Sequence, residues 1–323
     1  MLITLQKIRN NMRHILGISI GGTKSAICYA TLDDNKEIVS IDKRVIKTNP
    51  LDPYQTMDLV YQEIDQYPQD FDFISVICGS PMDADKGIIQ APSNLPGWID
   101  FPICPLLEER YKVKTAILND ADASALAEYH YGAGKGQNFK NFIYLIVGTG
   151  FGSGIIINEK LYYGSCSNAG EIGYVKCSDS GYLPRNKQRG TFEGFVSGGG
   201  MGDFANLYIK DYPDSLLNKI EKGKITAKDV FIAAHQDDAF ALMIVNQCAT
   251  KLGEAVSIYL NLLNPDAIAI GGIYPRGIDL LKEPMLKIVK EKALRPNYEH
   301  VKIIPSKLAE EIDDYSSLMG IYK

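Results

Sequence analysis

The sequence predicts an α/β protein built from two lobes of similar design. Its 323 residues suggest two domains, since a domain commonly takes about 150 residues. A strand, a glycine-rich turn and a second strand occur in that order in each half. Between them, apolar runs of strand length alternate with helical patterns. Together these observations predict a duplicated architecture.

The first arrangement begins near residue 14. Strand HILGISI (14–20) is followed by the turn Gly21–Lys24 and by strand SAICYATL (25–32). Apolar residues then recur at helical spacing over 57–67, and FISVICG (73–79) has the pattern of a fully buried strand.

The second arrangement begins near residue 141. NFIYLIV is a buried strand, 148–154 is predicted as a glycine-rich turn, and IIIN is the next strand. A long helix is predicted over 239–263, before Asn264-Pro265. We expect a tail over 1–12, a smaller lobe over 13–132 and a larger lobe over 133–307, with a terminal helix over 308–323 completing the smaller lobe.

Composition excludes several classes of protein. The net charge of −5 gives no excess of positive charge for nucleic acid or anionic lipid, and no window approaches the roughly 18 apolar residues of a membrane span. The six cysteines form no CxxC pair, which favours reduced thiols and a cytoplasmic protein over disulfides or a zinc site. They are Cys28, Cys78, Cys104, Cys166, Cys177 and Cys248.

Two glycine-rich turns predict a phosphate site. Paired glycines let backbone N–H groups approach an anion closely. One such turn alone is more simply a hairpin, but two between buried strands favour a nucleotide, and a third pair after AIAI suits adenine or ribose. The candidates are Gly21, Gly22, Thr23, Lys24, Gly148, Thr149, Gly150, Gly152, Gly271 and Gly272.

Three carboxylates are candidates for the chemistry. Asp120 follows the KTAIL strand and begins a helix pattern, so it is either a helix cap or a general base for phosphoryl transfer. Asn119 beside it could donate to a sugar hydroxyl. Glu171 and Glu193 stand among small residues and could accept hydrogen bonds from hydroxyls, although a single glutamate is more often a surface residue.

These segments together resemble the ROK family of bacterial sugar kinases and repressors. The resemblance runs in order from about residue 13 to the C-terminus and rests on several motifs. They are GISIGGTKSAI (17–27), APSNLPGW (91–98), LNDADASALAE (118–128), VGTGFGSGIIINEKLYYG (147–164), NAGEIGY (168–174), GTFEGFVSG (190–198) and NPDAIAIGG (264–272).

The resemblance implies the two-lobed actin/hexokinase-like (ribonuclease H-like) fold, with ATP in the interlobe cleft and Mg²⁺ as cofactor. Asp120 matches the family's catalytic base, and Asn94, Asn119, Glu171 and Glu193 match residues that hold sugar hydroxyls. A homodimer is possible by resemblance. Repressors of the family carry an additional N-terminal DNA-binding module, and because only about a dozen residues precede the first strand, we expect no DNA binding.

The sequence departs from the family pattern in two places. The first phosphate motif has Ser19 where the family usually has an aspartate near Mg²⁺. The family's structural zinc ligands, one histidine and three cysteines, are replaced by Tyr174, Pro184, Asn186 and Thr191. Cys177 has no partner nearby in sequence. We therefore expect no zinc, and Tyr174 is expected to alter which sugar substituents are recognised.

Three hypotheses follow. The leading one is an ATP-dependent kinase that phosphorylates the 6-hydroxyl of a glucose-like hexose or an N-acetylhexosamine, with Asp120 as the base. The second is a non-catalytic sugar sensor, favoured by Ser19 and disfavoured by the retained Asp120. The third is a kinase for an alcohol that is not a sugar, which the two glutamates disfavour.

Overall fold

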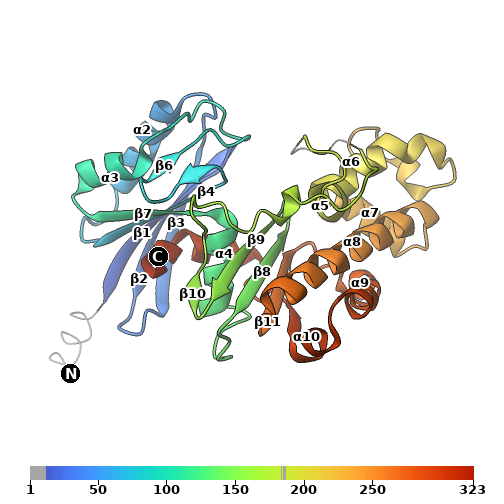
Figure 1. Ribbon diagram of the computed structural model, residues 1–323. Coiled ribbons are helices and arrows are strands. Elements are labelled where there is room, and N and C mark those ends of the chain that lie inside the picture. Colours follow the sequence, from blue (N-terminus) through green and yellow to red (C-terminus); the bar gives the residue numbers. More distant parts are fainter. Residues whose placement is uncertain (1–11, 183, 185–186) are drawn as a thin grey trace, which may run out of the picture. The chain divides into compact units, whose positions relative to one another are not determined.

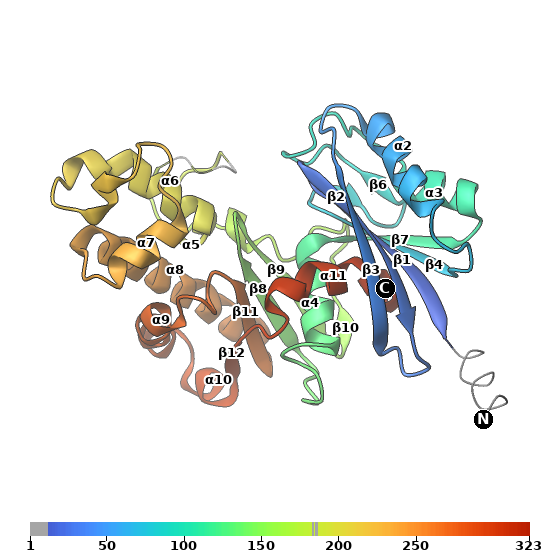
Figure 2. The same ribbon diagram turned by 180° about the vertical axis from the view of Figure 1, so that it is seen from behind.

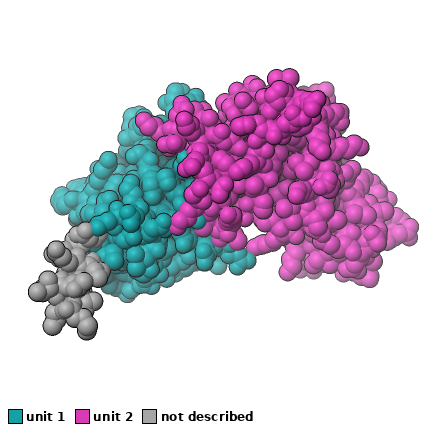
Figure 3. Space-filling model, turned by 90° about the horizontal axis from the view of Figure 1, so that it is seen from below, with its two compact units in different colours: residues 1–131, 161–169, 310–323 teal, residues 132–160, 170–309 magenta. Residues whose placement is uncertain are grey.

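The computed structural model describes residues 12–182, 184 and 187–323, so the expected tail over 1–12 lies outside the described residues except for Met12. The chain forms two compact units (Figure 3). The first contains the described residues up to Tyr131 together with Leu161–Ala169 and Glu310–Lys323, and the second contains Gly132–Lys160 and Gly170–Ala309. The expected lobe boundaries stay a prediction, because compact units need not be independently folding domains.

The first unit is built on a five-stranded sheet with the order β3-β2-β1-β4-β7. Strand β2 is antiparallel to both of its neighbours, β1 and β3, whereas β1, β4 and β7 run parallel. Their bounds are β1 Arg13–Ile20, β2 Lys24–Leu32, β3 Ile38–Lys47, β4 Phe73–Cys78 and β7 Lys114–Asn119. A two-stranded sheet of β5 (Met82–Asp83) and β6 (Ile88–Ile89) accompanies it.

Helices cover both faces of this sheet. Apolar side chains of α2 (Pro53–Ile64) and α3 (Ile103–Tyr111) share one core with β1 and β4, and the two helices lie together on one side of the strands (Figure 2). The other face is packed by α4 (Asp120–His130), α11 (Ile312–Ser317) and the short η5 (Met319–Tyr322). Burial on both faces explains why β4 is apolar throughout.

The second unit repeats the plan. Its sheet has the order β10-β9-β8-β11-β12, with β8 and β9 antiparallel and β8, β11 and β12 parallel. The bounds are β8 Phe142–Val147, β9 Phe151–Ile157, β10 Lys160–Leu161, β11 Ala267–Gly272 and β12 Lys302–Pro305. Because β1-β2-β3 and β8-β9-β10 occupy equivalent positions, the predicted duplicated α/β architecture is confirmed.

The long helix α8 (Ala239–Leu263) packs against this sheet and against its neighbour α9 (Ile278–Lys292) (Figure 1). Its predicted bounds, 239–263, are confirmed. The other helices are α5 Phe192–Val196, α6 Gly198–Tyr208, α7 Ala227–Ala234 and α10 Arg295–His300, with short turns η1 Ile172–Tyr174, η2 Ile209–Asp211, η3 Leu216–Lys219 and η4 Ala309–Glu311.

Three local predictions were wrong. The predicted turn over 148–154 ends at Gly150, because Phe151–Ile157 already pairs with β8 as a strand. The predicted terminal helix over 308–323 is broken into η4, α11 and η5. The helix expected over 57–67 ends at Ile64. Within the described residues, no helix has both the length and the apolar character that crossing a bilayer requires.

Candidate active site

The candidate residues of the first unit gather at the carboxyl edge of its parallel strands. Ile20 of β1 pairs with Cys78 of β4, and Cys78 pairs with Asn119 of β7, so the three strands end in one row. The residues that directly follow this row are Gly21, Gly79 and Asp120. Ligands of α/β sheets commonly bind just outside the carboxyl ends of parallel strands.

Asn119 begins helix α4 as its N-cap. Its Oδ1 accepts hydrogen bonds from the N–H groups of Ala121 (2.8 Å) and Asp122 (3.4 Å). Its Nδ2 donates to Ser80 Oγ over 2.6 Å. The alternative in which Asp120 is the cap was wrong, because Asn119 fills that position and thereby holds the start of the helix beside the loop after β4.

Asp120 occupies the first helical position and remains accessible to solvent. Its Oδ1 accepts a hydrogen bond from Ala121 N–H over 2.8 Å, and a Cβ added to Gly79 would lie only 3.9 Å from its Oδ2. Although water reaches the carboxyl group, the protein around it removes much of its hydration, and this desolvation raises its pKa. The Ala121 N–H and the Asp120 backbone oppose the shift, and Asp313 adds to it.

Gly22 and Asn94 are in direct contact. A Cβ on Gly22 would lie 2.6 Å from the carbonyl oxygen of Asn94 and 2.8 Å from its Cβ, so only glycine allows this approach. The Asn94 side chain is exposed, as are Thr23 and Lys24. The structure therefore brings one predicted sugar residue and the first glycine turn together.

The second unit also collects its candidates at a carboxyl edge. The turn Gly148–Gly150 follows β8, and its backbone is fixed by bonds from Gly148 N to Gly150 O (3.0 Å) and from Gly198 N to Gly148 O (2.8 Å). Thr149 at its tip is exposed. Gly152, predicted as part of the turn, lies in β9.

Glu193 reaches this turn from the first turn of α5. Its Oε2 accepts a hydrogen bond from Phe151 N–H over 3.4 Å, and a Cβ on Gly150 would come within 2.8 Å of the same oxygen. Gly173 also packs here, since a Cβ on it would lie 3.5 Å from Glu193 Cβ. The second glycine turn and a predicted sugar ligand thus adjoin each other.

Glu171 lies in the loop that packs on β9. Gly170, with φ +83°, has no room for a Cβ because Ser153 O would be 2.2 Å away, and its carbonyl accepts a hydrogen bond from Ser153 Oγ over 2.6 Å. Desolvation raises the pKa of the Tyr174 phenol, and the negative charges of Glu171 and Glu193 raise it further. Tyr174 is 49% exposed, so its phenol is available to a ligand beside both carboxylates.

The two residues of the third glycine pair differ. Gly271 is buried, and a Cβ on it would lie 2.1 Å from Tyr144 Oη, so its smallness serves packing. Gly272 is exposed at the end of β11, opposite Val147, where β8 leads into the second glycine turn. Gly272 is therefore the member of the pair that a nucleotide can reach.

The described residues of the loop between Tyr174 and Glu193 are held by packing and hydrogen bonds. Sequence reasoning missed Tyr182, which anchors them. Tyr182 is buried and donates its hydroxyl to Gly200 O over 2.8 Å. Pro184 packs on Gly194, and Thr191 pairs with Lys176. The only sequence signal for Tyr182 was an aromatic residue in a polar loop. Asn186, the remaining predicted replacement of a zinc ligand, lies outside the described residues.

Ser19 is the candidate that bears on Mg²⁺. It is half-buried in β1, where it pairs with Ala26 and Ile77. Within the described residues no three histidine, cysteine or carboxylate side chains gather as a metal site. The hydroxyl of Ser19 suits Mg²⁺ as an oxygen ligand but supplies no negative charge. Asp120 offers a carboxylate at the same edge of the sheet.

The family model described as "ROK family" matches residues 15–322. The chain belongs to the ROK family. A glucokinase from Halalkalibacterium halodurans is 34% identical over 293 residues, covering 87% of each chain. The N-acetylmannosamine kinase of Yersinia pestis is 28% identical over 257 residues, covering 80% of this chain and 82% of that one.

Solved structures of ROK proteins share the fold. A glucokinase from Streptomyces griseus, solved with glucose and AMPPNP, has a TM-score of 0.72 at 25% identity and covers 94% of this chain and 98% of its own. A ROK transcriptional regulator, a homologue of the E. coli MLC protein, has a TM-score of 0.82 at 22% identity, covering 96% of this chain and 78% of that one. The actin/hexokinase-like fold expected from the sequence is thereby confirmed.

Proposed function

We propose that this protein is an ATP-dependent sugar kinase that transfers the γ-phosphate to the 6-hydroxyl of a glucose-like hexose or an N-acetylhexosamine. The observation that carries the proposal is the row of strand ends in the first unit. In this row Asp120 and the Gly21–Lys24 turn lie on one edge of the sheet, on either side of the end of β4, and this supports a base and a phosphate-binding backbone in one site. The named activities of the relatives in the ROK family support the same reaction class.

Asp120 acts as the general base. It accepts the proton of the 6-hydroxyl while that oxygen forms a bond to the γ-phosphorus and the bond to the bridging oxygen breaks, which releases ADP. Asn94, Asn119, Glu171 and Glu193 hold the sugar hydroxyls. The glycine turns, with Thr23, Lys24 and Thr149, bind the phosphates through backbone N–H groups and side chains. Gly272 adjoins the nucleoside.

Mg²⁺ supplies neutralisation of phosphate charge when it is bound. Ser19 would offer it a hydroxyl oxygen, and ATP would supply phosphate oxygens. This side chain adds no negative charge that would attract Mg²⁺, because the Ser19 hydroxyl is neutral. Three expectations from the sequence stay predictions: a homodimer, the absence of nucleic-acid and membrane partners, and a cytoplasmic location.

The competing function is a non-catalytic sugar sensor, which Ser19 favours. The deciding experiment mixes purified protein with Mg-ATP and follows ADP release with glucose, mannose, fructose, allose, N-acetylglucosamine and N-acetylmannosamine. Release that depends on one of these sugars supports the kinase and ranks its substrates. Sugar binding measured by calorimetry without ADP release would contradict the kinase and support the sensor.

A further inference from the structure

The segment that joins β3 to α2 touches both candidate elements of the first unit. On one side, Thr48 N–H donates to the carbonyl of Thr23 over 3.0 Å, and Thr48 Oγ1 shares a buried hydrogen bond of 2.7 Å with Ser25 Oγ. The end of β3 is thereby tied to the first glycine turn. Of the residues in these two contacts, Thr23 is assigned to the proposed reaction, whereas Ser25 and Thr48 are not.

On the other side, the same segment supports the loop that carries Asn94. Gly97 N–H donates to Pro50 O over 2.9 Å, and a Cβ on Gly97 would lie 2.1 Å from Leu51 O. Trp98, which is fully buried, donates its Nε1–H to the carbonyl of Asn49 over 3.2 Å. The loop of Asn94 therefore lies directly on Asn49–Leu51.

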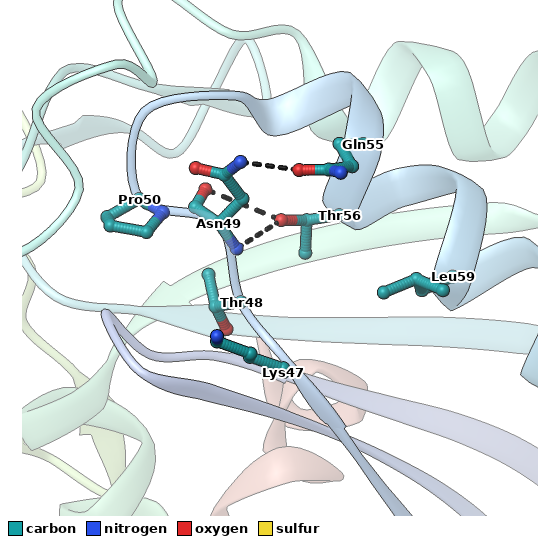
Figure 4. Close-up of a pocket in the computed structure, with 7 residues that line it drawn as sticks. All are labelled: Lys47, Thr48, Asn49, Pro50, Gln55, Thr56 and Leu59. Carbon is teal, nitrogen blue, oxygen red and sulfur yellow. Dashed lines mark hydrogen bonds between the residues drawn. The ribbon is translucent and has the colours of Figure 1, made fainter.

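Asn49 holds this segment in shape. Its Oδ1 accepts from the N–H groups of Leu51 (2.9 Å) and Asp52 (3.2 Å), which closes a tight turn before α2. Its Nδ2 donates to Gln55 Oε1 over 2.5 Å, and its backbone N–H donates to Thr56 Oγ1 over 2.9 Å. Figure 4 shows the bonds that join Asn49 to Gln55 and Thr56, among the residues that line a pocket beside this segment.

We propose that Asn49 is a positioning residue that fixes Asn94 relative to the Gly21–Lys24 turn. Asn94 is held between two contacts: Gly22 on one side, and Gly97 with Trp98 on the segment of Asn49 on the other. If the Asn49 turn opens, the carbonyl that receives Trp98 moves and Asn94 moves with its loop. Binding of the sugar then weakens, although Asn49 touches no substrate. This inference rests on the proposed sugar kinase function and adds a residue to it.

The test compares Asn49→Ala with Asn49→Asp. The alanine removes the acceptor that closes the turn, whereas aspartate keeps an oxygen for Leu51 and Asp52. We expect Asn49→Ala to raise the KM and the Kd for the sugar about tenfold, with a smaller change in kcat and in the KM for ATP. Asn49→Asp should keep both sugar constants within about twofold of the wild type. The control is Gln62→Ala, an exposed amide on the same helix α2.

Thermal unfolding of each variant identifies a change that is merely structural, since loss of folded protein lowers the apparent kcat through the active fraction and leaves both KM values unchanged. A folded Asn49→Ala protein with wild-type sugar constants would overturn the inference, as would equal losses in Asn49→Asp. Calorimetry and ADP release on the wild type come first. A wild type that neither binds nor phosphorylates a sugar contradicts the proposed function, and the inference falls with it.

Discussion

The carboxylate of Glu193 lies against the backbone of Gly150. A Cβ on Gly150 would be 2.8 Å from Glu193 Oε2, the oxygen that also accepts a hydrogen bond from Phe151 N–H. A residue expected to hold a sugar hydroxyl and a turn expected to hold a phosphate are therefore adjacent within one unit. Because the crowded atom is the end of a flexible side chain, a methyl group at Gly150 displaces the carboxylate without opening the core.

Gly150→Ala should consequently raise the sugar KM about tenfold and leave the midpoint of thermal unfolding almost unchanged. The matched variant is Gly148→Ala, since a Cβ there would meet no atom closer than Ile146 Cγ1 at 4.0 Å. It should affect the KM for ATP more than that for the sugar. Steady-state kinetics on both substrates checks this, and equal effects of the two variants on the sugar KM would contradict it.

The pH dependence of kcat/KM should report Asp120. A general base works only when it is ionised, and desolvation raises the pKa of Asp120 above its ordinary value of 3.8. Activity is therefore full above the raised pKa and is lost as the pH falls through it. We expect the acid limb of the profile to lie above pH 3.8 and to be missing from the residual activity of Asp120→Asn. Circular dichroism over the same range excludes acid unfolding, and an unchanged limb in the variant would assign it to another group.

Zinc should be missing from the purified protein. Elemental analysis should find no stoichiometric zinc, and a chelator should leave the thermal midpoint unchanged, because Tyr182 and its neighbours hold the loop. Tyr182→Phe removes the hydrogen bond to Gly200 O and should lower the free energy of unfolding by about 1 kcal/mol. A fall of the midpoint on chelation would contradict this account of the loop.

Ser19→Asp should lower the Mg²⁺ concentration needed for half-maximal ADP release several-fold, because a carboxylate binds Mg²⁺ more strongly than a hydroxyl does. The control is Ser19→Asn, which has nearly the same size as aspartate without its charge. Titration of Mg²⁺ at saturating ATP gives the two constants. If both variants behave alike, the effect comes from the volume of the side chain at this half-buried position rather than from the metal.

The sequence predicted most of the architecture because its strongest signals are local and periodic. Buried strands such as Phe73–Cys78 are continuous apolar runs, and α8 is bounded by the cap Asp238 and by Asn264 in the left-handed conformation. The glycines after Phe151 misled the prediction, since glycine allows a strand as well as a turn. Whether such residues pair is decided by β8, where Gly152 pairs with Ile146 and Gly154 pairs with Tyr144.

The candidate site was predicted less completely for the same physical reason. Motif spacing selected Asp120 and Glu193, but it considered only Asp120 as the helix cap, a position that Asn119 fills, and it did not distinguish buried Gly271 from exposed Gly272. Residues that act through others, such as Asn49 and Tyr182, carry no motif. Their roles depend on contacts with Trp98 and Gly200 that only the folded chain creates.

The central claim is that Asp120 is the base of a sugar kinase. The most direct measurement is sugar-dependent ADP release by wild type and Asp120→Asn, with sugar affinity measured by calorimetry on both. The account predicts that the variant, folded and with a thermal midpoint no lower than that of the wild type, binds the sugar with nearly the same affinity while kcat falls by at least about 10²-fold. Near wild-type turnover in Asp120→Asn would contradict it.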